Sequence, residues 1–167
     1  MKIETDIKLD FQDVLLRPKR TTLSSRSEVD LERTMTFPHS THKWTGVPIM
    51  VSNMDTTGVP AMYMEVVKHQ MITVFHKYID VEEIVNFNPE YYSLSTGISD
   101  ADYIKLKENV DRLKESGREV KFICIDVANG YMEQLVYFCK IMRKTFPNQI
   151  LIAGNVVSRE MVEELII

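Results

Sequence analysis

The stretch Phe122-Ile123-Cys124-Ile125-Asp126-Val127-Ala128-Asn129-Gly130-Tyr131 decides the fold. Its first four residues are apolar, which is typical of a buried strand, and Asp126 then places a carboxylate at the start of a loop. Other short apolar runs along the chain end in polar residues in the same way, at 53–55, 76–77 and 154–155. In a barrel of parallel strands, the carboxyl ends of the strands meet at one shared site. The repeated polar residues therefore predict a functional site at the carboxyl ends of the strands.

Composition excludes several classes of protein. The 167 residues are 44% hydrophobic and 26% charged, which is typical of one globular domain with a core. The net charge of -4 argues against binding to nucleic acid or to an anionic membrane surface. No apolar run approaches the roughly 20 residues that span a bilayer, and the amino terminus does not read as a signal peptide. The two cysteines have no metal-ligand spacing, and we expect a cytoplasmic protein.

The chain reads as one domain with two parts. Residues 1–45 predict an irregular amino-terminal arm, and residues 46–167 alternate short apolar runs with amphipathic segments, a pattern that favours a parallel sheet. We predict strands at 47–52, 72–75, 92–95, 122–126 and 150–153. We predict helices at 60–70, 81–87, 100–116, 132–146 and 158–167. The helix at 100–116 has the clearest signals, because Ser99 or Asp100 can cap its start and Gly117 suits a left-handed end.

Five strand-helix units are compatible with an open doubly wound sheet or with part of a closed eight-stranded barrel. No Gly-x-Gly-x-x-Gly motif follows the first predicted strand, which weakens the interpretation as a dinucleotide-binding doubly wound domain. Polar residues at the strand ends favour the barrel. We therefore predict an α/β fold, an incomplete (β/α)8 TIM barrel.

Eight motifs, in order along the whole chain, are similar to those of GMP reductases within the IMP dehydrogenase and GMP reductase superfamily. They lie at 11–18, 25–27, 46–49, 53–56, 76–77, 95–97, 126–131 and 153–157. Dehydrogenases of that superfamily usually read Pro-Met-Asp-Thr at 53–56 and Asp-Ser-Ser-Gln-Gly at 126–130, where this chain has Asn-Met-Asp-Thr and Asp-Val-Ala-Asn-Gly. The direct connection at 80–91 also leaves no room for the regulatory insert that many dehydrogenases carry. The reductase branch is favoured.

The resemblance implies NADPH-dependent reductive deamination of GMP to IMP and ammonia. In that family the nucleophilic cysteine lies in a loop after the sixth strand, and we expect this chain to end, at Ile167, before that loop. The chain then corresponds to an amino-terminal half that has no catalytic nucleophile of its own and needs a complementary carboxyl-terminal piece. Cys124, inside an apolar strand, and Cys139, on a predicted helix, are interpreted as packing residues. A homotetramer is implied only for a completed barrel.

By matching positions, the resemblance also implies binding residues and no metal ligand. The expected cofactor contacts are Ser25, Arg26, Lys77, Asp126, Val127 and Ala128, of which the first two would reach the cofactor of a neighbouring subunit. The expected substrate contacts are Ser52, Asn53, Met54 and Asn155. Taken without the resemblance, Lys77 reads as a solvated lysine, and Asp126 could instead bind a backbone amide of its loop.

Two other hypotheses remain open at this point. The chain could be a non-catalytic truncated homologue that binds or modulates an intact GMP reductase, or it could be a remnant without stable function. The binding-protein hypothesis is favoured if Lys77 and Asp126 can be replaced without effect while substitutions around Ser25 and Arg26 in the arm abolish association with a full-length GMP reductase.

Overall fold

The computed structural model describes residue 3 and residues 5–167, which fall into two compact units, Met1–Asp30 and Leu31–Ile167. The first unit contains two short 3-10 helices, η1 (Phe11–Asp13) and η2 (Arg26–Glu28). Each starts at a capping side chain, because Asp10 accepts a hydrogen bond from the Phe11 amide and Ser25 accepts one from the Ser27 amide. The second unit contains the sheet and all the α-helices of the described residues.

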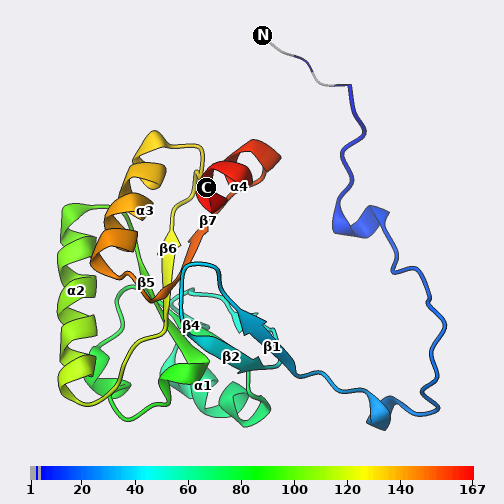
Figure 1. Ribbon diagram of the computed structural model, residues 1–167, viewed down its shortest axis with the longest axis horizontal. Helices are drawn as coiled ribbons and strands as arrows, with labels where there is room; N and C mark the ends of the chain where they lie inside the picture. The colour runs from blue at the N-terminus through cyan, green and yellow to red at the C-terminus, as the bar shows by residue number, and fades with distance from the viewer. Residues whose placement is uncertain (1–2, 4) are drawn as a thin grey trace. The chain divides into compact units, whose positions relative to one another are not determined.

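The sheet of the second unit has five parallel strands in chain order (Figure 1). They are β3 (Met50–Val51), β4 (Ile72–Phe75), β5 (Tyr92–Thr96), β6 (Phe122–Asp126) and β7 (Ile150–Gly154). All five predicted strands are present, and only the first is much shorter than predicted. The cause is local, because Pro48 has no amide hydrogen and the Ile49 amide donates to the Val47 carbonyl oxygen at 2.7 Å instead of to a strand.

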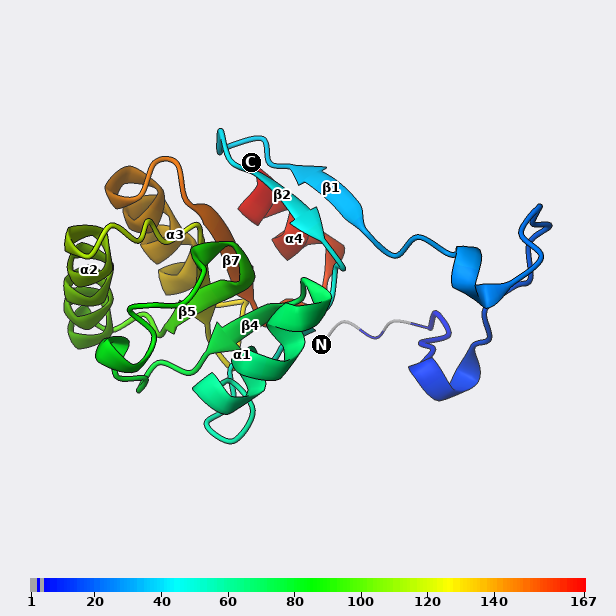
Figure 2. The same ribbon diagram turned by 90° about the horizontal axis from the view of Figure 1, so that it is seen from below.

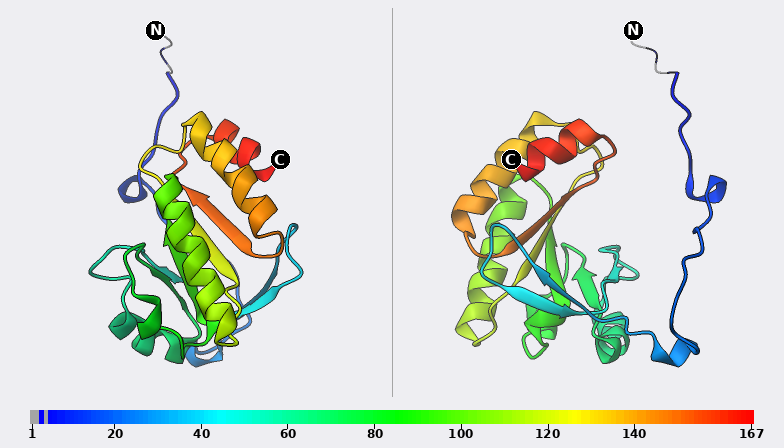
Figure 3. Two further views of the ribbon diagram at one scale, coloured as in Figure 1. Left: turned by 90° about the vertical axis from the view of Figure 1, so that its left-hand side faces the viewer. Right: turned by 45° about the vertical axis from the view of Figure 1, so that its right-hand side comes forward.

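Four α-helices accompany the strands: α1 (Pro60–Val66), which continues as the 3-10 helix η3 (Val67–His69), α2 (Asp100–Glu115), α3 (Glu133–Thr145) and α4 (Arg159–Ile166). Helix α2 starts at a Ser99 cap and is followed by Gly117 at φ 75°, as predicted. Helices α2 and α3 lie side by side on one face of the sheet (Figure 3), where the rings of Tyr103 and Phe138 meet edge to face at 6.3 Å.

The helix predicted at 81–87 is wrong. That segment forms only a 3-10 turn, η4 (Val81–Glu83), followed by a second one, η5 (Pro89–Tyr91). Asp80 caps η4 by accepting from the Glu82 amide at 3.1 Å. Pro89 disfavours helical geometry at the residue before it, so a helix cannot extend through Asn88. The few residues that remain before Asn88 are too short to form a stable α-helix.

The prediction that the whole of 1–45 is irregular is also wrong. Strands β1 (Arg33–Thr36) and β2 (Lys43–Gly46) pair as an antiparallel hairpin within the second unit. Their sequences, Arg-Thr-Met-Thr and Lys-Trp-Thr-Gly, contain one large apolar residue each, too few for the apolar run or the alternation that predicts a strand. The Trp44 side chain of β2 helps to anchor the hairpin, since it is only 1% exposed.

The two faces of the sheet have different roles. Phe75, Leu94 and Ile123 pack on the outer face in one core with buried residues of α2 and α3. On the opposite, inner face, a second core at the amino ends of the strands consists of Trp44, Ile72, Phe122 and Ile150. The Trp44 ring lies edge to face with Phe122 at 6.4 Å, and its Nε1 donates to the Glu90 carbonyl oxygen at 2.9 Å. The hairpin therefore closes the amino-terminal end of the curled sheet, as seen from below in Figure 2.

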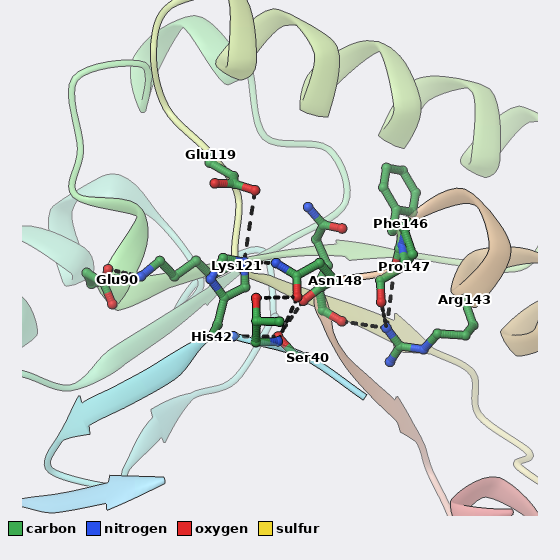
Figure 4. Close-up of polar contacts among 11 residues, drawn as sticks. Ser40, His42, Glu90, Glu119, Lys121, Arg143, Phe146, Pro147 and Asn148 are labelled. Atoms are coloured by element: carbon green, nitrogen blue, oxygen red, sulfur yellow. Dashed lines mark hydrogen bonds and ion pairs between the residues drawn. The ribbon is translucent and has the colours of Figure 1, made fainter. Parts of the chain in front are cut away.

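Polar contacts fix the hairpin turn to the segment that enters β7 (Figure 4). The Asn148 Oδ1 accepts from the Thr41 amide at 2.7 Å and from the Thr41 hydroxyl at 2.8 Å, and Ser40 donates to the Asn148 carbonyl. Arg143 from α3 donates to the carbonyl oxygens of Phe146 and Gln149. The contacts of Ser40 and Thr41 with Asn148 join residues more than 100 positions apart in the chain, so that the hairpin turn and the start of β7 are held together.

One glycine controls how the loop after β3 packs on β4. A Cβ atom at Gly58 would lie 2.3 Å from the Val74 carbonyl oxygen and 3.0 Å from that of Ser52, both backbone atoms. We expect Gly58→Ala to lower the free energy of unfolding by about 1–3 kcal/mol, because the backbone must shift to relieve the overlap. Urea unfolding followed by far-UV circular dichroism measures this, with Thr56→Ala in the same exposed loop as the control. An unchanged midpoint for Gly58→Ala would contradict the prediction.

Candidate functional site

A cleft of about 240 Å³ lies at the carboxyl ends of the parallel strands. Its lining comes from the segments that follow β3 and β4 and from the last residues of β5 and β6, and consists of Asn53, Asp55, His76, Lys77, Tyr78, Ser95, Thr96 and Asp126. Three of the predicted binding residues, Asn53, Lys77 and Asp126, are therefore brought together in one place, as the repetition of polar strand ends predicts.

A hydrogen bond across the cleft shows how strongly the sheet curls. The Asn53 Nδ2 donates to the Asp126 Oδ2 at 2.8 Å. These residues follow β3 and end β6, which are separated by β4 and β5 in the sheet. In a flat sheet, three strand spacings of about 4.8 Å would hold them about 14 Å apart. The contact is therefore possible only because the sheet is bent toward its inner face, as in part of a barrel.

Lys77, which follows β4 in the cleft lining, forms an ion pair with Asp102. Its Nζ lies 3.1 Å from the Asp102 Oδ1, and 5.3 Å from the centre of the Tyr78 ring. The hydrogen bond that Lys77 donates to the Asp102 carboxylate raises the pKa of Lys77. Burial raises the pKa of Asp102, but hydrogen bonds from Ser99 and Lys77 outweigh it and the net pKa is lowered. Both groups are therefore charged at neutral pH.

The cleft lining also holds an imidazole and a hydroxyl group. The His76 Nδ1 accepts from the Tyr78 amide at 3.2 Å, which leaves the proton of a neutral imidazole on Nε2. The Ser95 hydroxyl donates to the Phe75 carbonyl oxygen at 2.5 Å. Together with Asp126, a pure acceptor, and Lys77, a pure donor, these groups suit a polar ligand with both donors and acceptors.

The other predicted residues lie outside the cleft lining. Ser52 and Met54 flank Asn53 in the loop after β3, and both are exposed. Val127 and Asn155 continue the pairing of β6 with β7, because the Asn155 amide donates to the Val127 carbonyl oxygen at 2.8 Å. Ala128 is exposed in the loop after β6. The roles of these residues as cofactor or substrate contacts stay predictions.

The two remaining predicted residues, Ser25 and Arg26, belong to the first unit. Ser25 caps η2, and Arg26 is its first residue. Their hydroxyl and guanidinium groups are exposed within that unit. Their predicted contact with the cofactor of a neighbouring subunit stays a prediction.

The cysteines do not have the character of nucleophiles. Burial raises the pKa of the Cys124 thiol to about 11, with the Asp126 charge adding to the effect, and burial raises that of Cys139 to about 11 as well. A thiol with such a pKa is almost entirely protonated at neutral pH. Across residues 3 and 5–167, the side chains form no group of His, Cys, Asp and Glu that could hold a metal ion, and no helix there is long and apolar enough to span a bilayer.

The chain is similar in sequence to curated GMP reductases. GMP reductase of Shewanella halifaxensis is 47% identical over 174 residues, which cover 100% of this chain and 49% of that protein. GMP reductase 1 of Mus musculus is 48% identical over 172 residues, covering 99% of this chain and 49% of the relative. The resemblance to GMP reductases is confirmed. The chain spans about half the length of these curated relatives.

The fold has its own counterpart among solved structures. Inosine 5′ monophosphate dehydrogenase from Legionella pneumophila is similar with a TM-score of 0.67 and 24% sequence identity, over 93% of this chain and 46% of that one. At this identity the likeness concerns the fold alone, and it supports an α/β fold with a curled parallel sheet. No family model matches the chain.

Asp55, His76, Ser95 and Thr96 lie in the GMP reductase motifs but were not among the predicted binding residues, and two further residues of the site lie outside the motifs. Tyr78 directly follows the predicted pair at 76–77 and contributes an exposed ring to the cleft. Asp102 lies in the first turn of α2, and its carboxylate reaches Lys77. A sequence signal for Asp102 was present, since Ser99 and Asp102 have the spacing of a capping box, but that spacing predicts only a helix start.

Proposed function

We propose that this chain supplies the cofactor wall and part of the substrate wall of a GMP reductase, which converts GMP to IMP and ammonia with NADPH. The strongest support is that Asn53, Lys77 and Asp126 line one cleft in a chain that is 47% identical, over its full length, to a GMP reductase. The convergence of these three groups is what a polar ligand at the carboxyl edge of a barrel requires.

The cleft groups fit a reduced nicotinamide nucleotide. The Asp126 carboxylate can only accept hydrogen bonds, so it suits the amide of the nicotinamide ring or a ribose hydroxyl, and Asn53 holds one of its oxygens in place. The Lys77 ammonium suits oxygen acceptors of the same ligand. NADPH, when bound, supplies hydride. The protein side chains orient the NADPH, and Val127 and Ala128 lie beside it. Ser25 and Arg26 reach the NADPH that is bound to a neighbouring subunit.

The substrate is proposed to lie on the residues around the end of β3 and after β7. Ser52, Asn53 and Met54 would contact the purine from one side, and Asn155 from the other. The nucleophilic cysteine is assigned to a part outside this chain, because the thiols of Cys124 and Cys139 are protonated and lie within the sheet and a helix. We propose that a complementary polypeptide completes the (β/α)8 barrel, and that the completed barrel forms a homotetramer in the cytoplasm.

The test compares this chain alone, a complementary polypeptide alone, and the two mixed. The complement carries the remaining strands and the cysteine loop of a GMP reductase. GMP-dependent consumption of NADPH, with release of ammonia, is expected only in the mixture. If folded chain and folded complement associate but consume no NADPH with GMP, the proposed activity is wrong.

A second function is favoured by one observation. In the first unit, the side chains of Phe11, Leu15 and Leu16 are 93%, 97% and 99% exposed, which is unusual for large apolar groups and typical of a segment that binds another protein. In this alternative the chain is a non-catalytic homologue that binds and modulates an intact GMP reductase. Co-purification with the intact enzyme, a changed rate, and loss of both on replacing Leu15 and Leu16 with serine would favour it.

A further inference from the structure

Three segments meet at the wall of the cleft that carries Lys77. Lys77 follows β4, Gly97 follows β5, and Asp102 lies in the first turn of α2. The Lys77 Nζ lies 3.1 Å from the Asp102 Oδ1, with the two side chains 38% and 21% exposed. An ion pair between exposed side chains is weak, but this one is partly shielded and has a fixed partner.

The fixed partner is the carboxylate of Asp102. Its second oxygen, Oδ2, accepts from the Ser99 hydroxyl at 2.7 Å and from the Ser99 amide at 3.4 Å, as part of the capping box that starts α2. One carboxylate thus serves two purposes, with Oδ2 in the helix cap and Oδ1 on the lysine. Because the helix start fixes Asp102, the ammonium of an otherwise flexible lysine is held at one place on the cleft wall.

Gly97 provides the space that this arrangement needs. A Cβ atom at Gly97 would lie 2.4 Å from the Asp102 Oδ2 and 3.0 Å from its Cγ. The backbone of Gly97 does not have a positive φ, so that an alanine is compatible with the chain conformation. The glycine is therefore required by the carboxylate beside it and not by the geometry of the turn.

We propose that Asp102 is a positioning residue that holds the Lys77 ammonium at the cleft, and that Gly97 is required there because it leaves room for the Asp102 carboxylate. The proposal deepens the proposed function, on which the role of Lys77 as a cofactor contact rests. One of the three ammonium donors is directed to Asp102, and the other two can serve oxygen acceptors of a bound dinucleotide. The raised pKa of Lys77 and the lowered pKa of Asp102 agree with this arrangement.

The decisive measurement is the rate at which the Lys77 amine is acetylated at alkaline pH, followed by mass spectrometry of the peptide. Only an uncharged amine reacts, so a lysine held as an ammonium reacts slowly. We expect Asp102→Asn and Gly97→Ala each to increase the rate at Lys77 several-fold. Ser99→Ala is the matched comparison, since it removes the hydroxyl that holds Oδ2 but keeps the carboxylate and its pairing with Lys77, and a smaller increase than for Asp102→Asn is expected.

A double replacement tests whether Gly97 acts through Asp102. In an Asp102→Ala background the atoms that a Cβ at Gly97 would meet most closely are gone, so Gly97→Ala is expected to add no further increase. Unchanged labelling of Lys77 in folded Asp102→Asn protein would overturn the positioning role. A further increase from Gly97→Ala in the Asp102→Ala background would overturn the role of Gly97.

Binding of NADPH separates this inference from the proposed function. If the unchanged chain binds NADPH and Asp102→Asn weakens binding several-fold, with Asp102→Glu restoring part of it, both proposals gain support. If the labelling of Lys77 changes as expected but the unchanged chain, alone and with its complement, binds no NADPH, the positioning role stands and the proposed function fails.

Discussion

Replacing Trp44 with alanine is expected to lower the free energy of unfolding by about 3–5 kcal/mol, the usual cost of removing a large buried aromatic side chain. Trp44 is 1% exposed, packs against Phe122 and donates its indole N–H to the Glu90 carbonyl oxygen. Its loss would leave a cavity at the amino-terminal end of the sheet and an unpaired carbonyl. Urea unfolding measures the change, and far-UV circular dichroism must follow it because Trp44 is the single tryptophan of the chain.

The matched control for this prediction is Trp44→Phe. Phenylalanine keeps an aromatic ring against Phe122 but lacks the N–H donor, so a smaller loss is expected than for alanine. If Trp44→Ala unfolds at the same urea concentration as the unchanged chain, the hairpin does not contribute to the stability of the sheet. The core of Trp44, Ile72, Phe122 and Ile150 would then be incidental to the fold.

Replacing Asp126 with alanine is expected to weaken NADPH binding by about 10- to 100-fold. This corresponds to the roughly 1.5–3 kcal/mol that a hydrogen bond to a charged group contributes. Asp126 ends β6, lines the cleft and is oriented by Asn53. Among the described residues that line the cleft, Asp126 is the only one whose carboxylate is held by a side-chain amide, that of Asn53, and the alanine variant removes this carboxylate. Titration of nucleotide fluorescence with protein gives the dissociation constant.

Two further variants separate charge from orientation. Asp126→Asn keeps the size of the side chain and an oxygen that can accept from Asn53, but removes the charge. Asn53→Ala keeps the charge and removes the orienting hydrogen bond, so that its effect is expected to be smaller than that of Asp126→Ala. Equal affinity of the unchanged chain and Asp126→Ala for NADPH would remove Asp126 from the proposed cofactor wall.

The parallel strands could be predicted from sequence because each is a short apolar run that ends in polar residues. The runs at 72–75 and 122–126 match β4 and β6 to the residue. The hairpin could not be predicted, because its stability comes from Trp44 packing against residues far along the chain. The missing helix at 81–87 has a local apolar pattern but is ended by the geometry around Pro89.

The candidate site was predictable where a polar residue lies at or just after the end of a strand. Asn53 and Lys77 lie two residues after β3 and β4, Asp126 is the last residue of β6, and the curled parallel sheet brings the three together. Asp102 was not predictable as part of the site, because its sequence context explains it fully as a helix cap. Its contact with Lys77 depends on how α2 is placed against the end of β4, and a sequence pattern carries no information about that placement.

The order of the strands has a consequence for how the chain folds. Each parallel strand pairs with the strand that follows it in the chain. The paired residues are between 19 positions apart, as for Thr73 and Tyr92, and 29 positions apart, as for Ser93 and Phe122. Such short loops close at low entropic cost, so the sheet can grow strand by strand as the chain leaves the ribosome. The hydrogen bond between Ser40 and Asn148, 108 positions apart, can form only after the segment before β7 has emerged. The hairpin turn is thus locked late, on a sheet that is already largely assembled.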